Sequence, residues 1–148
     1  MLKISRLSDY ATLILSRLAQ SATTSLSAAQ IARETELPAP TVSKLLKIYT
    51  DAKLLISTRG PHGGYRLARS ADSIDLATII EVVEGQKSLT DCLKINGRCV
   101  HSDRCTMQTN WQHISAMVVD IFKNISLADM CLPFNKTQLN AVRRNINE

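Results

Sequence analysis

Aromatic side chains are scarce in this sequence, and long hydrophobic runs are missing from it. Phenylalanine, tryptophan and tyrosine make up 4% of the 148 residues although 45% are hydrophobic, so we expect an aliphatic and mostly helical core. No hydrophobic run approaches the roughly 20 residues that a membrane-spanning helix needs. Charged residues at Lys3, Arg6 and Asp9 make the N-terminus a poor signal peptide, which predicts a cytoplasmic protein with no membrane partner.

The residue combinations that mark enzyme active sites are lacking as well. We find no paired carboxylates, no Ser–His–Asp set and no nucleotide-binding loop. The glycine-rich segment Gly60–Gly64 resembles a phosphate-binding loop, but it does not lie between a strand and a helix. We therefore expect that the protein is not an enzyme.

The first third of the chain has the hydrophobic period of successive helices. Ser8 is the expected N-cap of the first helix, with Asp9 in its acidic first turn. Ser27 begins a capping-box sequence, and the helix after it should end near Glu36. Pro40 suits the first position of the next helix, which follows after a tight turn.

Beyond these helices the period changes to the alternation of strands. Residues Ile56–Arg59 and Tyr65–Ala68 alternate on either side of the glycine-rich tip. Two helices joined by a tight turn and followed by a hairpin are typical of a winged helix-turn-helix. We therefore predict a mainly α fold: a winged helix-turn-helix DNA-binding domain with a two-stranded wing over residues 1–88, a cysteine loop over 89–109, and a long dimerisation helix plus a C-terminal helix over 110–148.

Positive charge is concentrated on the helix and the hairpin that would dock on a duplex. The chain has a net charge of +5, and residues 38–70 alone contain six basic residues against Asp51. Such residues are more often a solvated face, but their concentration on the docking elements favours double-stranded DNA as the partner. We expect short side chains and one lysine near the bases and the remaining cations mostly on phosphates. The predicted DNA-binding residues are Thr41, Ser43, Lys44, Lys47, Arg59, His62 and Arg66.

Three of the four cysteines are gathered in a polar segment with turn residues. Six residues separate Cys92 from Cys99, and five separate Cys99 from Cys105. Free cysteines are usually buried, so three thiols in a loop suggest a soft metal or an iron–sulfur cluster. Loop cysteines without a ligand, or a zinc site, are the alternatives. Cys131 is expected to be a small buried hydrophobic residue.

The last long helix carries more hydrophobic surface than one small domain needs. The stripe runs from Trp111 to Ile125. It could pack on the first and fourth helices of the same chain, but a helix that leaves a winged domain is also a common dimerisation device. We expect a homodimer whose recognition helices match two operator half-sites.

Several motifs in this order resemble those of one known family. The segments RLSDYATLIL, LPAPTVSKLLK and RGPHGGYRLAR, followed by the three-cysteine loop and a long helix, resemble the IscR/NsrR family of iron–sulfur transcriptional regulators. Within that family, the chain is most similar to regulators of SUF-type iron–sulfur assembly genes. The resemblance implies a dimeric repressor whose operator affinity is controlled by a cluster, either 2Fe–2S or 4Fe–4S, held by Cys92, Cys99 and Cys105 at the dimer interface. A nitric-oxide-sensing repressor of the same family and an electron carrier that binds no DNA are the competing functions.

Two departures from the family pattern concern the ligands. The first gap between cysteines is six residues where the family usually has five, and Gln108 occupies the place of a histidine ligand. Asp9 aligns with an aspartate that NsrR-like members donate from the partner subunit, so it is the candidate fourth ligand. It could instead only favour the helix dipole, and His101 is another possible ligand.

Overall fold

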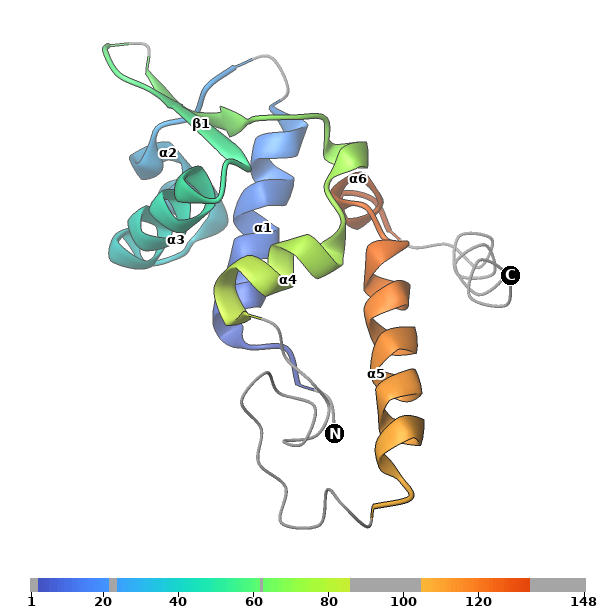
Figure 1. The fold of residues 1–148 in the computed structure, drawn as a ribbon. Helices are drawn as coiled ribbons and strands as arrows, with labels where there is room; N and C mark the ends of the chain where they lie inside the picture. The colour runs from blue at the N-terminus through green and yellow to red at the C-terminus, as the bar shows by residue number, and fades with distance from the viewer. Residues whose placement is uncertain (1–2, 22–23, 62, 86–104, 134–148) are drawn as a thin grey trace.

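The computed structural model describes residues 3–21, 24–61, 63–85 and 105–133 as a helical domain with a small hairpin. It confirms the predicted fold class, a mainly α chain with a two-stranded antiparallel sheet and a long helix (Figure 1). No helix in these ranges is long and hydrophobic enough to cross a bilayer. The elements are α1 (Arg6–Gln20), α2 (Ala28–Thr35), α3 (Ala39–Asp51), β1 (Leu55–Thr58), β2 (Gly64–Leu67), the short 3₁₀ helix η1 (Ala71–Ser73), α4 (Leu76–Glu84), α5 (Gln108–Lys123) and α6 (Leu127–Met130).

The core is aliphatic, as the composition predicts. It lies between α1, α2, α3 and α4, and Tyr49 is the one aromatic residue among its buried members in the described ranges. The row that α3 contributes matches the expected helical spacing. Its buried residues are Val42, Leu45, Leu46 and Tyr49.

Helix α1 begins one turn earlier than expected, so the assignment of Ser8 as its N-cap is wrong. The cap is Ser5, whose hydroxyl accepts a hydrogen bond from the backbone N–H of Ser8 at 3.2 Å. Ser8 lies inside the helix and is fully buried. The sequence permits both assignments because both residues are serines, and burial of the second one decides between them.

The next two helices begin close to their predicted positions. Ser27 and Gln30 form the expected capping box of α2, which ends at Glu36 with a left-handed backbone. Helix α3 begins at Ala39, so Pro40 occupies its second position instead of its first. Proline is tolerated there because the first-turn N–H groups have no partner within the helix.

The wing is the predicted hairpin, with each strand beginning one residue earlier than expected. Leu55 pairs with Leu67 at its base, and Thr58 pairs with Gly64 near its tip. Leu26, just before α2, adds a third strand segment: it exchanges two backbone hydrogen bonds with Tyr65, at 2.8 and 3.0 Å. The wing is therefore attached to the helices at its second strand.

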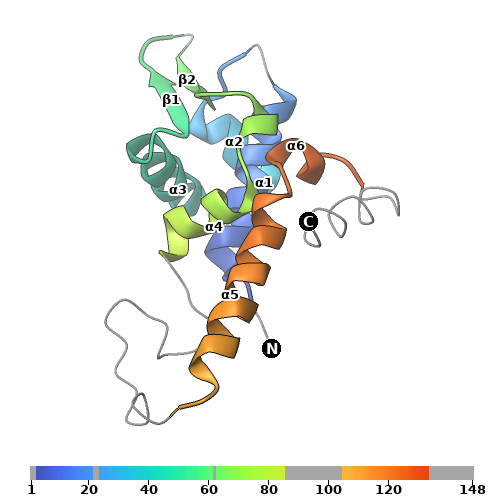
Figure 2. The ribbon, with the colours of Figure 1, turned by 45° about the vertical axis from the view of Figure 1, so that its right-hand side comes forward.

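The end of α5 is held against the start of α4 by backbone hydrogen bonds. The N–H of Leu76 donates to the carbonyl of Ile125 at 2.8 Å, and the N–H of Leu127 donates to the carbonyl of Ile74 at 2.7 Å. Leu127 is fully buried. The other end of α5 extends away from the remaining helices (Figures 1 and 2). The expected C-terminal helix after Pro133 lies outside the described residues.

The close approach of Leu26 to the wing predicts that Gly64→Ala destabilises the protein. A Cβ at position 64 would lie 2.6 Å from the backbone oxygen of Leu26, so the strand must shift. We expect a loss of about 1–3 kcal/mol in the free energy of unfolding, measured by urea denaturation. Ser57→Ala, at an exposed position of β1, is the control and should change stability by less than about 0.5 kcal/mol. Equal stability of the two variants would contradict this packing.

Candidate nucleic-acid interface and metal site

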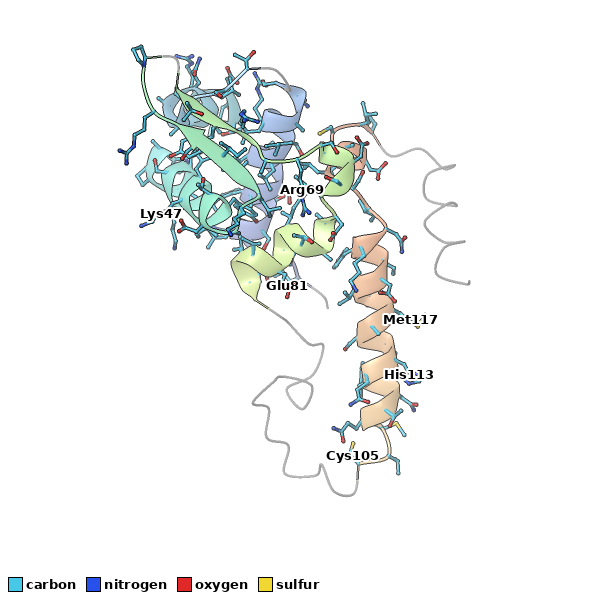
Figure 3. All side chains as sticks on the ribbon, turned by 45° about the horizontal axis from the view of Figure 1, so that its top comes forward. Lys47, Arg69, Glu81, Cys105, His113 and Met117 are labelled. Carbon is cyan, nitrogen blue, oxygen red and sulfur yellow. The ribbon has the colours of Figure 1, made fainter. Side chains whose placement is uncertain are left out.

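The outer face of α3 presents the predicted base-reading residues to solvent. Ser43, Lys44 and Lys47 are exposed, and Thr41 is half-buried, on the sides of the helix that do not face the core. Figure 3 shows Lys47 on the outer side of α3. The buried row on the opposite face fixes which side of α3 points outward, and the first turns are the part of a recognition helix that contacts base edges.

The wing adds cations beside this helix. Arg59 follows β1 and is exposed, and Arg66 is exposed in β2. Arg66 pairs directly with Ile56, so both side chains lie on the same face of the hairpin. His62, the remaining predicted contact, lies outside the described residues.

These cations are not neutralised within the described part of the chain. Ion pairs there join Arg17 to Glu34 and Lys123 to Asp120, and neither α3 nor the wing takes part in one. Lysine and arginine side chains without carboxylate partners are free to neutralise phosphates and release counterions. The predicted interface thus consists of exposed cations on α3 and on the wing.

Tyr49 fixes the position of α3 against α4. Its hydroxyl donates a 2.6 Å hydrogen bond to the carbonyl of Ile79, and its side chain is 1% exposed. Burial raises the pKa of Tyr49 well above its ordinary value, and the negative charge of Glu84 raises this pKa further. The hydroxyl therefore stays protonated and keeps donating to α4.

The structure places two of the four predicted metal ligands. Cys105 is a half-buried free thiol just before α5, at the end of that helix far from Lys47 (Figure 3). Asp9 is exposed in the first turn of α1. Cys92, Cys99 and the alternative ligand His101 lie outside the described residues. Within the described ranges, no three His, Cys, Asp or Glu side chains converge on a point, so the ligand set stays a prediction.

Helix α5 exposes hydrophobic side chains from its first turn to Val119. Trp111, Ile114 and Met117 are 41%, 43% and 53% exposed, whereas Ile121 and Phe122, nearer the anchored end, are half-buried. Packing on α4 within the same chain therefore covers only the later part of the stripe. Within the described residues, the earlier part is not covered by another element.

Ser5 and Glu84, which lie at the start of α1 and the end of α4, were not singled out from the sequence. Glu84, at the end of α4, accepts hydrogen bonds from the backbone N–H of Ser5 and from the hydroxyl of Ser8. The spacing of Ser5 and Ser8 could have suggested the earlier cap. Nothing local marks Glu84, because its partners lie 79 and 76 positions away.

Comparison with known proteins assigns this architecture to a family. The profile of the Rrf2 family, described as an iron-dependent transcriptional regulator, matches residues 4–133. The chain belongs to the Rrf2 family. This confirms the resemblance at the level of the family and does not specify the SUF branch.

Individual relatives of this Rrf2 chain are also transcriptional regulators. The HTH-type transcriptional regulator IscR of Vibrio campbellii is 39% identical over 88 residues, which cover 60% of this chain and 49% of the relative. IscR of Sodalis glossinidius is 34% identical over 96 residues, which cover 65% and 56% of the two chains. This chain thus spans about half the length of the curated relatives it matches. Because these relatives are regulators, they confirm the expectation that the chain is not an enzyme.

Solved structures of regulators share the fold of this Rrf2 chain. CymR, the global cysteine regulator of B. subtilis, is 28% identical with a TM-score of 0.71, and the match covers 88% of this chain and 97% of CymR. IscR of T. potens is 29% identical with a TM-score of 0.67, over 87% and 85% of the two chains.

The buried Tyr49 hydroxyl predicts a stability change and a pH dependence. Tyr49→Phe removes the hydrogen bond to Ile79 and should lower the free energy of unfolding by about 1 kcal/mol near neutral pH. The pKa of Tyr49 is raised in the folded protein above the ordinary 10.0, so the unfolded chain loses this proton first. The stability that the Tyr49 hydroxyl provides is therefore fully present below pH 10.0, the ordinary pKa, and is lost as the pH rises from there toward the higher pKa of the folded protein.

Urea denaturation between neutral pH and pH about 11 checks this, because an unfolded tyrosine ionises near pH 10. The wild type should lose stability more steeply than Tyr49→Phe at the alkaline end. Parallel pH profiles for the two proteins would show that Tyr49 is not held protonated by its surroundings.

Proposed function

We propose that this chain is a dimeric DNA-binding transcriptional repressor whose operator affinity is controlled by an iron–sulfur cluster. The observation that carries the proposal is the placement of unpaired cations on α3 and the wing, at one end of a molecule whose other end carries Cys105. The genes that it controls are those of SUF-type iron–sulfur cluster assembly, and its location is the cytoplasm.

DNA binding follows from the exposed surface of the winged helix. Helix α3 enters the major groove with Thr41, Ser43 and Lys44 near base edges, and Lys47 contacts a phosphate. Arg59, His62 and Arg66 extend the contact along the backbone from the wing. The excess of positive charge in residues 38–70 supports this assignment.

The exposed hydrophobic part of α5 supports a homodimer. Two copies that bury Trp111, Ile114 and Met117 against each other remove the exposed hydrophobic row from water. A twofold dimer also presents two α3 helices, which match half-sites roughly 34 Å apart on the duplex.

The donor chemistry of the cysteines fits an iron–sulfur cluster. Cys92, Cys99 and Cys105 provide three thiolates, and Cys105 is a free, half-buried thiol beside the exposed part of α5. Asp9 of the partner subunit is the fourth ligand; a carboxylate is harder than a thiolate and holds iron less firmly. The description of the family as iron-dependent supports iron over zinc. When bound, the cluster supplies a centre that oxidants, nitric oxide or iron shortage can damage.

The protein's part is to convert the state of this site into operator affinity. The Asp9 carboxylate on α1 of the other subunit, when it binds the cluster, links the two winged-helix domains of the dimer. Release of this carboxylate lets the distance between the two domains change. A coupling free energy of about 1–3 kcal/mol, typical of allosteric proteins, changes affinity roughly 5- to 150-fold.

The different roles of the α3 lysines provide a test of DNA binding. Lys44→Ala should weaken operator binding by about 1–3 kcal/mol and relax the sequence preference, because it removes a base contact. Lys47→Ala should weaken binding to specific and unrelated DNA alike and lower the slope of log affinity against log salt by about 0.9. Fluorescence anisotropy with operator and scrambled duplexes at several salt concentrations measures both effects.

Lys123→Ala, which removes a cation paired with Asp120 on α5, is the matched control and should leave the affinity unchanged. If neither α3 variant binds more weakly than this control, α3 is not the DNA-reading helix. An electron carrier would show no sequence-specific binding at all.

The fourth cysteine provides a control for the metal site. Anaerobically purified Cys105→Ser should lose most of its iron and acid-labile sulfide, whereas Cys131→Ser should keep both. Cys131 lies at the end of α6, where its thiol donates to the carbonyl of Leu127 at 3.2 Å. Asp9→Ala should retain the thiolates and yield a less stable cluster with an altered visible spectrum.

Metal and sulfide analysis with absorption spectroscopy distinguishes the outcomes. A colourless wild-type protein that contains only zinc would replace the cluster with a structural zinc site. Equal iron loss in the two cysteine variants would contradict the proposed ligand set.

A further inference from the structure

The start of α1 and the end of α4 are joined through one carboxylate oxygen. Oε1 of Glu84 accepts a hydrogen bond from the backbone N–H of Ser5 at 2.9 Å and another from the hydroxyl of Ser8 at 2.5 Å. Glu84 is the last residue of α4, and Ser5 is the N-cap of α1. We call this arrangement of Ser5, Ser8 and Glu84 the α1–α4 latch.

One member of the latch, Ser8, lies in the interior of the domain, where it is fully buried. Its hydroxyl is shielded from water, so its hydrogen bond to a charged acceptor has no solvent replacement. Loss of Glu84 removes the carboxylate acceptor of this buried hydroxyl, whereas loss of the Ser8 hydroxyl leaves Glu84 bonded to the N–H of Ser5.

The position of Glu84 does not serve the stability of its own helix. A carboxylate at a helix C-terminus faces the negative end of the helix dipole, which is unfavourable. The same carboxylate lies against the N-terminal end of α1, where the dipole favours a negative charge. What Glu84 stabilises is therefore the first turn of α1 and its attachment to α4.

The latch joins the turn that carries Asp9 to α4, the helix that α3 contacts. Asp9 directly follows Ser8, so the residue proposed as a metal ligand is in the turn that the latch holds. On the other side, Tyr49 of α3 donates to the carbonyl of Ile79 on α4. Glu84 and Ile79 belong to the same nine-residue helix, so the latch and the α3–α4 hydrogen bond are joined by α4.

We propose that Glu84 is a positioning residue that couples the metal site to operator binding. By holding Ser5 and Ser8, it fixes the first turn of α1, and with it Asp9, relative to α4 and α3. A change in what Asp9 binds then shifts α4 and, through Ile79 and Tyr49, the recognition helix. This inference rests on the proposed function, since it assigns a residue to the coupling between the two sites.

The test compares the operator affinities of metal-loaded and metal-free protein in full-length variants. Glu84→Ala removes both hydrogen bonds of the latch, and Ser8→Ala removes the one from the buried hydroxyl. Glu84→Gln can keep both because both go to one oxygen. Arg17→Ala is the matched control, because it removes the 2.6 Å contact between α1 and α2 and leaves α4 untouched. All affinities are measured by anisotropy at one stated salt concentration, and the thermal midpoint of each variant is recorded.

We expect the wild type to show a loaded-to-free affinity ratio that differs from one by roughly 5- to 150-fold. Ser8→Ala and Glu84→Ala should bring this ratio close to one while both forms still bind DNA. Glu84→Gln should retain most of the wild-type difference in affinity between the two forms. Arg17→Ala should lower the thermal midpoint and leave the affinity ratio unchanged. Amide hydrogen exchange on the metal-free protein should also be faster in the first turn of α1 in Ser8→Ala than in Arg17→Ala.

The outcomes separate this inference from the function on which it rests. If Ser8→Ala and Glu84→Ala melt earlier but keep the wild-type ratio, the latch is only structural and the inference is wrong. If metal-loaded and metal-free wild-type protein bind the operator with equal affinity, the proposed control by the cluster is wrong, whatever the variants show. Should Glu84→Ala not fold, Ser8→Ala, which removes a single hydroxyl, decides the question.

Discussion

The backbone hydrogen bonds between residues 74–76 and 125–127 are the constraint on which the arrangement depends. They join the segment before α4 to the segment after α5, although about fifty residues separate the two in the sequence. The capping side chains Asp75 and Ser126 sit at this junction and begin α4 and α6. Because one end of α5 is held here and beside α4, the other end can extend from the domain without losing its orientation.

With α5 anchored in this way, the predicted DNA-binding residues that the structure describes and Cys105 lie at opposite ends of the molecule (Figure 3). The exposed cations of α3 and the wing lie at one end, and Cys105 lies at the other, at the start of α5 (Figure 3). Helix α4 contacts the helices that lead to both ends. It packs against α5, and its residue Ile79 accepts the hydrogen bond from Tyr49 of α3. Packed helices therefore connect α5 to α3 through α4, which is the physical route that the proposed coupling requires.

The parts of the fold that depend on local sequence could be predicted. The capping box at Ser27, the buried row of α3 and the hairpin follow from residues a few positions apart, and the errors were shifts of about one residue or one turn. The partnership of Ser8 with Glu84 could not be predicted, because it depends on how α4 packs against α1. The predicted DNA-binding residues that the structure describes are exposed, apart from Thr41, which is half-buried. The cysteine site rests on spacing and resemblance, since two of its three thiols lie outside the described residues.

The central claim is that the state of the cysteine site sets how strongly the winged helix holds its operator. One preparation of wild-type protein, titrated with an operator duplex before and after anaerobic removal of iron at the same salt concentration, tests it most directly. The account predicts operator affinities that differ by at least several-fold, with little change in affinity for unrelated DNA. Indistinguishable operator affinities in the two states would contradict it.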